Sequence, residues 1–291
     1  MAAHGVVLGG GGVVGVAWEL GVLAALHDEG LAPVDDARIV VGTSAGSLVA
    51  SHLLRGASLA DLVALQHEPS AGLSEPSPEP DLNVLAELFN TWTNATSIDE
   101  ETARRVCDLA MRAPTISEDD LIALSTSNLP DGAWPDRSLL VTAVACTTGR
   151  RIAWSESGVD LRRAVASSCS VPGLFPPVTV DPAADERYVD GGLWSGTNAD
   201  LVRDDGIDAV LIVESMSVIN GQLGALSKRT LEGEITALES AGVRVATVSP
   251  TPAYTDLGPH LMDPAHRIDG LDLGRVDGKA ALPAVRELLA G

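Results

Sequence analysis

Short apolar runs rich in β-branched residues recur along the 291-residue chain and alternate with segments of helical spacing. Such runs, bounded by glycine or polar residues, are typical of buried strands. They predict strands at 5–8, 39–41, 138–146, 188–190, 208–214 and 243–249, with 151–154 folding back on 138–146 as a hairpin. The alternation of strands and helices predicts an α/β fold with a mostly parallel central sheet and helices on both faces.

Apolar residues at helical spacing predict the helices that separate these strands. The predicted helices are 16–29, 45–54, 58–66, most of 81–112, 118–124, 161–168, 223–242 and 279–289. Residues 69–80 contain four prolines, three serines and two glutamates, a composition typical of an exposed loop. No repeat or domain boundary is visible in the sequence. We therefore predict one domain over residues 1–291, with a helical insertion at about 69–133 that could cover a site as a lid.

Acidic residues outnumber basic ones, 40 to 19, which gives a formal net charge of −21. Nucleic acids and strongly anionic membranes are themselves polyanions, so this balance argues against either as a constant partner. It does not exclude a local apolar patch that touches lipid. The first consequence of the charge is a well-solvated surface.

The cysteines and the N-terminal segment favour a reducing compartment. Cys107, Cys146 and Cys169 show neither an even count nor a C-x-x-C spacing, so we expect free thiols. No lysine or arginine precedes Arg38, and the uncharged run 5–18 is too short and too rich in glycine to span a bilayer. We therefore expect a cytoplasmic protein without a transmembrane helix, and the sequence indicates neither a cofactor nor a metal site.

The strongest candidate for chemistry is Gly42-Thr43-Ser44-Ala45-Gly46, a G-x-S-x-G motif between a predicted strand and a predicted helix. In this context a sharp turn holds the serine at its apex, and the glycines leave room where strand and helix pass closely. The helix N-terminus behind the serine favours developing negative charge. The motif therefore predicts that Ser44 is a nucleophile.

A glycine-rich loop follows the first predicted strand and allows two interpretations. Gly10-x-Gly12-x-x-Gly15 matches the dinucleotide-binding fingerprint. That fold also needs an acidic residue at the end of the second strand, where this chain continues into Ser44. Alternatively, successive amides of the loop form an oxyanion hole, because a parallel strand pair places the loop beside the turn that carries the serine.

A serine nucleophile needs a base, and the sequence offers two kinds of candidate. His260 and His266 follow Asp190 in the chain, so either would complete the Ser-Asp-His order of an α/β-hydrolase triad. Against this, only one predicted strand precedes that of Ser44, and both histidines lie in polar, proline-containing segments. Asp190 follows an apolar strand end and precedes two glycines. A carboxylate beside a serine takes its proton directly if apolar walls raise its pKa.

Four motifs follow one another: Gly10-Gly11-Gly12-x-x-Gly15, Gly42-Thr43-Ser44-Ala45-Gly46, the segment 167–177 (SSCSVPGLFPP) and Asp190-Gly191-Gly192. Their order and approximate spacing resemble those of the patatin-like phospholipases, over about two thirds of the chain. The resemblance implies a three-layer α/β/α fold and a Ser–Asp dyad without histidine. It makes Ser44 the nucleophile and Asp190 the base, with an oxyanion hole formed by the amides of Gly10, Gly11 and Gly12.

The resemblance also implies hydrolysis of lipid esters through an acyl-enzyme at Ser44, as in a phospholipase A, lysophospholipase or carboxylesterase. The substrate is then a lipid or acyl ester, and transient contact with a membrane or micelle surface is expected. Many family members carry arginine where this chain has Val14, and without that guanidinium a phosphate headgroup loses a bidentate partner. We therefore expect neutral or lysolipid esters and simple acyl esters to be better substrates than anionic diacyl phospholipids.

Overall fold

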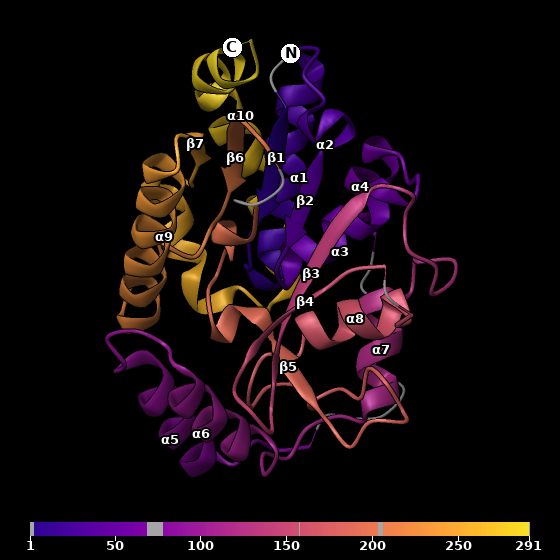
Figure 1. Ribbon diagram of the computed structural model, residues 1–291, viewed down its shortest axis with the longest axis vertical. Helices are drawn as coiled ribbons and strands as arrows, with labels where there is room; N and C mark the ends of the chain where they lie inside the picture. Colours follow the sequence, from indigo (N-terminus) through magenta and orange to yellow (C-terminus); the bar gives the residue numbers. More distant parts are fainter. Residues whose placement is uncertain (1–2, 69–77, 157, 203–205, 291) are drawn as a thin grey trace.

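A computed structural model describes residues 3–68, 78–156, 158–202 and 206–290 of the chain. The described strands are β1 (His4–Leu8), β2 (Ile39–Gly42), β3 (Ser138–Ala145), β4 (Arg151–Trp154), β5 (Tyr188–Asp190), β6 (Ala209–Val213) and β7 (Arg244–Val248). They form one sheet in the order β4-β3-β2-β1-β6-β7, and β5 also pairs with β3 (Figure 1). Strands β3, β2, β1, β6 and β7 are parallel, whereas β4 and β5 are antiparallel to β3. The predicted parallel sheet and its hairpin are therefore confirmed.

Helices lie on both sides of this sheet (Figure 1). The described α-helices are α1 (Gly12–Asp28), α2 (Pro33–Asp36), α3 (Ala45–Leu54), α4 (Leu59–Leu65), α5 (Leu82–Thr93), α6 (Glu100–Ala110), α7 (Glu118–Thr126), α8 (Leu161–Ser168), α9 (Gln222–Ser240) and α10 (Arg267–Ala290). Short 3-10 helices are η1 (Gly191–Leu193), η2 (Ala199–Val202), η3 (Pro252–His260) and η4 (Pro264–His266). Of the loop predicted at 69–80, residues 69–77 lie outside the described part of the chain.

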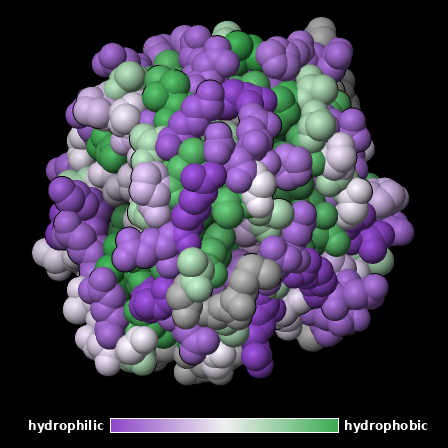
Figure 2. Space-filling view, turned by 90° about the horizontal axis from the view of Figure 1, so that it is seen from above, coloured by the Kyte–Doolittle hydropathy of each residue, from purple (hydrophilic) through white to green (hydrophobic). Residues whose placement is uncertain are grey.

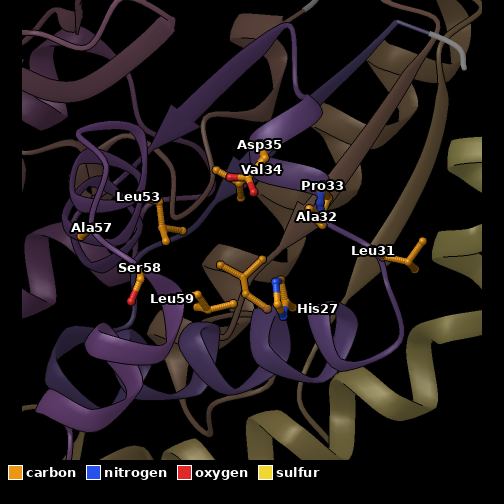
Figure 3. Close-up of a pocket in the computed structure, with 11 residues that line it drawn as sticks. His27, Leu31, Ala32, Pro33, Val34, Asp35, Leu53, Ala57, Ser58 and Leu59 are labelled. Atoms are coloured by element: carbon orange, nitrogen blue, oxygen red, sulfur yellow. The ribbon is translucent and has the colours of Figure 1, made fainter.

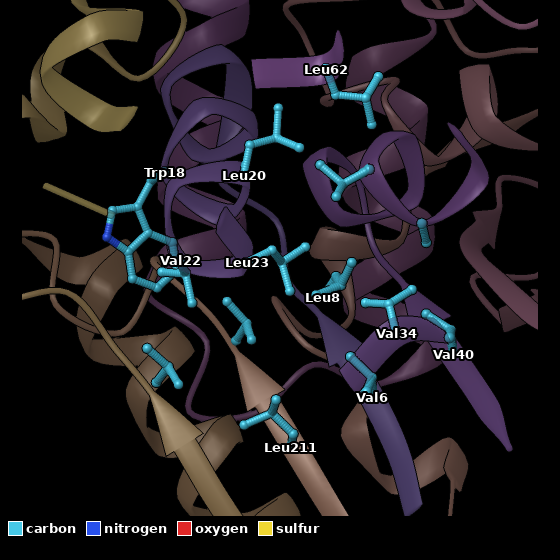
Figure 4. Close-up of a cluster of buried hydrophobic side chains, with 14 of the residues drawn as sticks. Val6, Leu8, Trp18, Leu20, Val22, Leu23, Val34, Val40, Leu62 and Leu211 are labelled. Atoms are coloured by element: carbon cyan, nitrogen blue, oxygen red, sulfur yellow. The ribbon is translucent and has the colours of Figure 1, made fainter. Parts of the chain in front are cut away.

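One face of the sheet packs against α1, α3, α8 and α10. Successive side chains of a strand point to opposite faces, which turns Val6 and Leu8 of β1 and Leu211 of β6 to this side. There they join Trp18 and Leu20 of α1 in the largest core cluster (Figure 4). All five residues are at most 1% exposed, so this layer is held by burial of apolar surface.

The opposite face packs against α9 and η2 and, near β3 and β5, against α5 and α6. Val7 of β1 and Ile212 of β6 point to this side and share a buried cluster with Leu238 of α9. A neighbouring cluster links Val144 of β3 and Val189 of β5 to α5 and α6. Two helical layers around the sheet give the predicted three-layer α/β/α fold.

The contact between α1 and α10 depends on glycines where the two helices cross. A Cβ atom on Gly274 would lie 2.1 Å from the carbonyl oxygen of Trp18, and one on Gly21 would lie 2.2 Å from that of Leu271. Trp18 Nε1 also donates a buried hydrogen bond to Asp277 Oδ2 at 2.8 Å. The two backbones therefore approach each other more closely than side chains would permit.

The prediction that the last helix covers only 279–289 is wrong, because α10 begins at Arg267. Residues 267–278 contain three glycines, and glycine has low helix propensity, so this half of the helix shows little helical signal in the sequence. Likewise, α1 begins at Gly12 rather than Val16, inside the glycine loop. By contrast, α3 and α8 have the predicted bounds of 45–54 and 161–168.

The end of the molecule that carries both termini has a mixed surface, on which apolar side chains are scattered among hydrophilic ones (Figure 2). All three cysteines are buried and free, as predicted. Among the helices of the described residues, none is long and apolar enough to cross a membrane.

Replacement of Gly274 by alanine tests the crossing of α1 and α10. We expect Gly274→Ala to lower the free energy of unfolding by about 2–3 kcal/mol, because the new methyl group must push two backbones apart. The matched control is Gly233→Ala in α9, where a Cβ meets nothing within 4 Å. There the higher helix propensity of alanine should add about 0.5–1 kcal/mol. Chemical denaturation measures both, and a Gly274→Ala protein as stable as the parent would contradict the close crossing.

Candidate active site

Ser44 and Asp190 meet because two strands end at the same place along β3. Strand β4 pairs with one edge of β3 at 141–144, which leaves the other edge for both β2 and β5. On that edge β2 pairs in parallel with residues 138–141, and β5 pairs antiparallel with residues 143–145. The two strands therefore run towards each other, and their carboxyl ends bring the serine and the aspartate together.

Ser44 occupies the turn between β2 and α3 in a backbone conformation that L-residues rarely adopt, with φ 52° and ψ −116°. Such a conformation costs about 1–3 kcal/mol and persists only where the surrounding structure holds it. A Cβ on Gly46 would lie 2.1 Å from the carbonyl oxygen of Leu8, and one on Gly42 would lie 2.6 Å from Cα of Ser47. The close passage of strand and helix that the motif predicts is therefore present.

Hydrogen bonds from neighbouring side chains hold the backbone of Ser44 in this turn. Its N–H donates to Ser168 Oγ at 2.9 Å, and its carbonyl accepts from Ser47 Oγ at 2.7 Å and from Cys169 Sγ at 3.6 Å. Two of these partners belong to the segment 167–177, the third of the sequence motifs. This segment thus supports the turn from the end of α8, and Ser44 itself is 7% exposed.

The carboxyl group of Asp190 is buried beside Ser44, with only 3% of the residue exposed. Burial raises the pKa of Asp190 from 3.8 to about 7, while hydrogen bonds from the Gly192 N–H and the Ser44 side chain act in the opposite direction. The Gly192 N–H donates to Asp190 Oδ1 at 2.7 Å. A carboxylate whose pKa lies near neutrality is well matched to accept a proton at physiological pH. A carboxyl group suited to accept a proton therefore lies beside the hydroxyl group of Ser44.

Asn198, which no sequence motif indicates, connects the turns that carry Ser44 and Asp190. Its Nδ2 donates to the hydroxyl oxygens of Thr43 and Thr142 at 3.0 and 3.3 Å. The two threonine hydroxyls also bond to each other at 2.8 Å, and all three residues are fully buried. A satisfied buried network of this kind fixes the positions of its members. Asn198 Nδ2 also donates to the carbonyl of Gly191 at 3.4 Å, so the network links the ends of β2 and β5 to β3.

The glycine loop lies next to Ser44, since a Cβ on Gly10 would be 3.6 Å from the serine Cβ. The Gly10 N–H already donates to the carbonyl of Gly196 at 2.8 Å, so this amide is engaged, contrary to its predicted role in an oxyanion hole. The N–H groups of Gly11 and Gly12 have no acceptor within the described residues. They open α1, where the helix dipole favours negative charge.

The structure gives no support to the two alternatives from the sequence. His260 and His266 lie against each other, with ring centroids 4.7 Å apart. Every histidine falls within the described residues, and none of them hydrogen-bonds to Ser44 or Asp190. The acidic residue of a dinucleotide site is also missing, because β2 ends at Gly42 and leads directly into the serine turn.

Position 14, where the sequence suggests a lost headgroup contact, faces the core. Val14 is 0% exposed, and its Cγ1 would lie 2.9 Å from a Cβ on Gly270 of α10. Its N–H donates to the carbonyl of Leu261 at 3.0 Å. The valine therefore packs α1 against α10 and presents no group to a substrate.

A cavity of about 250 Å³ lies at the other end of the sheet (Figure 3). It is lined by the segment 31–35 and by side chains that include His27 of α1, Leu53 of α3 and Leu59 of α4. The segment 31–35 precedes β2, whereas Ser44 follows it. The cavity therefore lies at the amino ends of the parallel strands, away from their carboxyl ends, where α/β sheets bind their ligands.

Known proteins provide an independent comparison. The model of a family described as patatin-like phospholipase matches residues 6–203. Among curated proteins, no sequence matches this chain. Similar solved structures include VipD from Legionella pneumophila, at 14% identity and a TM-score of 0.45, and the type III effector ExoU of Pseudomonas aeruginosa, at 15% and 0.42. These matches cover 97% of this chain but 67% of VipD and 53% of ExoU, so the chain spans about half of ExoU.

Replacement of Asp190 by asparagine tests the cost of burying its charge. A carboxyl group whose pKa rises from 3.8 to about 7 on folding stabilises the protein fully only below the lower value, and this stability is lost as pH rises towards 7. Asparagine has a similar shape and no charge at any pH. The free energy of unfolding of Asp190→Asn should therefore exceed that of the parent by about 4 kcal/mol at pH 8 and by much less at pH 4.

Denaturant unfolding of the parent and Asp190→Asn at both pH values measures this difference. The control is Asp272→Asn, at an exposed position of α10, which should change stability by less than about 0.5 kcal/mol throughout. A gain for Asp190→Asn that is the same at pH 4 and pH 8 would show that its carboxyl group is not desolvated.

Proposed function

The chain belongs to the patatin-like phospholipase family, and on this premise we propose that it is a serine acyl hydrolase of lipid esters. Ser44 is the nucleophile and Asp190 the base. The observation that carries the proposal is that the carboxyl group of Asp190, only 3% exposed, lies beside the strained Ser44 at the meeting point of two strand ends. A serine hydroxyl is a weak nucleophile by itself, and an adjacent base activates it. With a pKa of about 7, the aspartate serves as that base without a histidine.

The first half of the reaction transfers the acyl group to the enzyme. Asp190 takes the proton of the Ser44 hydroxyl while Oγ attacks the ester carbonyl carbon, whose π electrons move to oxygen. The N–H groups of Gly11 and Gly12, at the N-terminus of α1, stabilise this oxyanion. As the intermediate collapses, the bond to the alcohol oxygen breaks and Asp190 returns the proton to that oxygen. The alcohol leaves, and an acyl-enzyme remains on Ser44.

The second half releases the acyl group as a fatty acid. Asp190, ionised again, removes a proton from water as the water oxygen attacks the acyl carbon, and the same amides stabilise the second oxyanion. The bond from carbon to Ser44 Oγ then breaks, and Asp190 returns its proton to Oγ. The free serine and the ionised aspartate are restored, so one base serves both halves.

Helix α5 adjoins the site and offers apolar surface for an acyl chain. Leu88 of α5 would lie 3.0 Å from a Cβ on Gly173, within the segment that supports the serine turn. Leu82, the first residue of α5, is 73% exposed, and Leu174, the neighbour of Gly173, is 39% exposed. Exposed leucines on adjoining segments favour contact with acyl chains or a lipid surface. In this proposal the described part of the predicted insertion, residues 78–133, covers the entrance for the acyl chain.

Fluorophosphonate labelling followed by intact-mass measurement tests the dyad, because the reagent traps an activated serine as one covalent adduct. We expect one adduct on the parent, none on Ser44→Ala, and labelling of Asp190→Asn slowed by at least about 100-fold. The parent rate should rise with pH up to about 7 and then level off, since only the ionised carboxylate accepts the proton.

Asp272→Asn is again the matched control and should be labelled at the parent rate. An adduct that persists on Ser44→Ala would contradict the assignment of the nucleophile. Labelling of Asp190→Asn at the parent rate would exclude Asp190 as the base while leaving the nucleophile in place.

The charge of the protein predicts a preference among substrates that differ in the charge of their headgroup. The net charge of −21 repels an anionic surface, and Val14 supplies no guanidinium for a phosphate. We expect a neutral lysolipid to be hydrolysed about tenfold faster than an anionic diacyl phospholipid with the same acyl chain, in matched mixed micelles at low ionic strength. Salt should narrow the gap, because it screens surface charges. Equal or faster turnover of the anionic lipid would refute this preference.

A further inference from the structure

A turn that the proposed reaction does not use brings three metal-ligating side chains together. The 3-10 helices η3 and η4 follow each other closely, ending at His260 and His266. A 3-10 helix has three residues per turn, so side chains three positions apart lie above one another. The Asp263 N–H donates to the His260 carbonyl at 2.8 Å and the His266 N–H to the Asp263 carbonyl at 3.2 Å, so two successive three-residue turns link His260, Asp263 and His266. Their ligand atoms all lie within 4.8 Å of one another.

We propose that His260, Asp263 and His266 bind one divalent transition-metal ion, for which Zn²⁺ is the probe. Two imidazoles and one carboxylate, with water in a fourth position, are a ligand set that suits tetrahedral Zn²⁺. Bonds of about 2.0–2.1 Å place such ligand atoms about 3.3 Å apart. None of the three residues is buried, so small side-chain rotations close the present separation.

An outer partner for one of the histidines is already in place. His266 Nδ1 lies 3.2 Å from Asp269 Oδ2, and because an ionised carboxylate only accepts, the ring nitrogen donates. Nε2 then keeps its lone pair for the metal, an arrangement usual at histidine-ligated sites. The neighbouring guanidinium of Arg267 is held by the carbonyls of Pro264 and Glu68. The net charge of −21 also attracts cations.

The same turn lies on the N-terminus of α1. The carbonyl of Leu261 accepts from the Val14 N–H at 3.0 Å. A Cβ on Gly12 would lie 2.7 Å from this carbonyl oxygen and equally close to the sulfur of Met262. Leu261 and Met262 stand between the first two metal ligands in the chain, so a bound ion restrains their motion. Metal binding therefore stiffens the cover over the first amides of α1.

Calorimetric titration of Zn²⁺ into protein without an affinity tag tests the site. We expect one Zn²⁺ per chain. Asp269→Asn should weaken binding about 10–100-fold, and His260→Ala or His266→Ala should weaken it more. The matched control is His27→Ala, which removes an exposed histidine at the far end of α1 and should bind like the parent. Far-UV circular dichroism without metal checks that each variant folds.

Zn²⁺ binding that is absent from the parent, or unchanged in both His260→Ala and His266→Ala, would overturn the site.

Amide hydrogen exchange tests whether metal binding restrains the N-terminus of α1. Zn²⁺ should slow exchange of the Val14 N–H at least about threefold in the parent and have no effect in His266→Ala. Zn²⁺ binding to the parent without slower exchange at Val14 would overturn the coupling to the glycine loop.

Discussion

The proposed proton transfer from Ser44 to Asp190 depends on a carboxyl group held where burial raises its pKa to about 7. An ionisable group in such a place costs free energy that the rest of the fold must offset. The sheet fixes it by joining β2 and β5 end to end along one edge of β3. At this junction a Cβ on Gly191 would lie 2.2 Å from Thr142 Oγ1, so glycine alone fits. Strand register, rather than a flexible loop, therefore sets the geometry of the pair.

The parts of this arrangement that the sequence predicts are those with a local physical signal. Alternating apolar strands and helices indicate the layered fold, and the glycines of the G-x-S-x-G motif indicate the sharp turn at Ser44. The apolar run before Asp190 likewise indicates a strand that ends in a carboxylate. That the two residues meet follows from the family resemblance, whereas the structure supplies the reason, the shared edge of β3.

The features that the sequence does not predict depend on partners far away in the chain. The amide of Gly10 is free or engaged according to the position of the Gly196 carbonyl. Asn198 acquires its role only from two distant threonines, Thr43 just after β2 and Thr142 of β3. The sequence does not predict the first half of α10, because its glycines weaken the helical signal. The same glycines are needed there because the backbone of α1 lies too close for a side chain. The spacing of His260 and His266 gains meaning only because hydrogen bonds close two successive three-residue turns between them, where the sequence predicts polar loops.

The family match ends at residue 203, yet the remaining segment belongs to the same core. Strand β6 pairs with β1 at the centre of the sheet, and α10 packs along α1. The glycine loop is held on one side by the Gly196 carbonyl, inside the match, while α1 is held at Val14 by the Leu261 carbonyl, beyond it. A proposed oxyanion site built on these amides is thus shaped by both parts of the chain. This shared support favours our proposal of a single domain, because neither part can move without disturbing the first turn of α1.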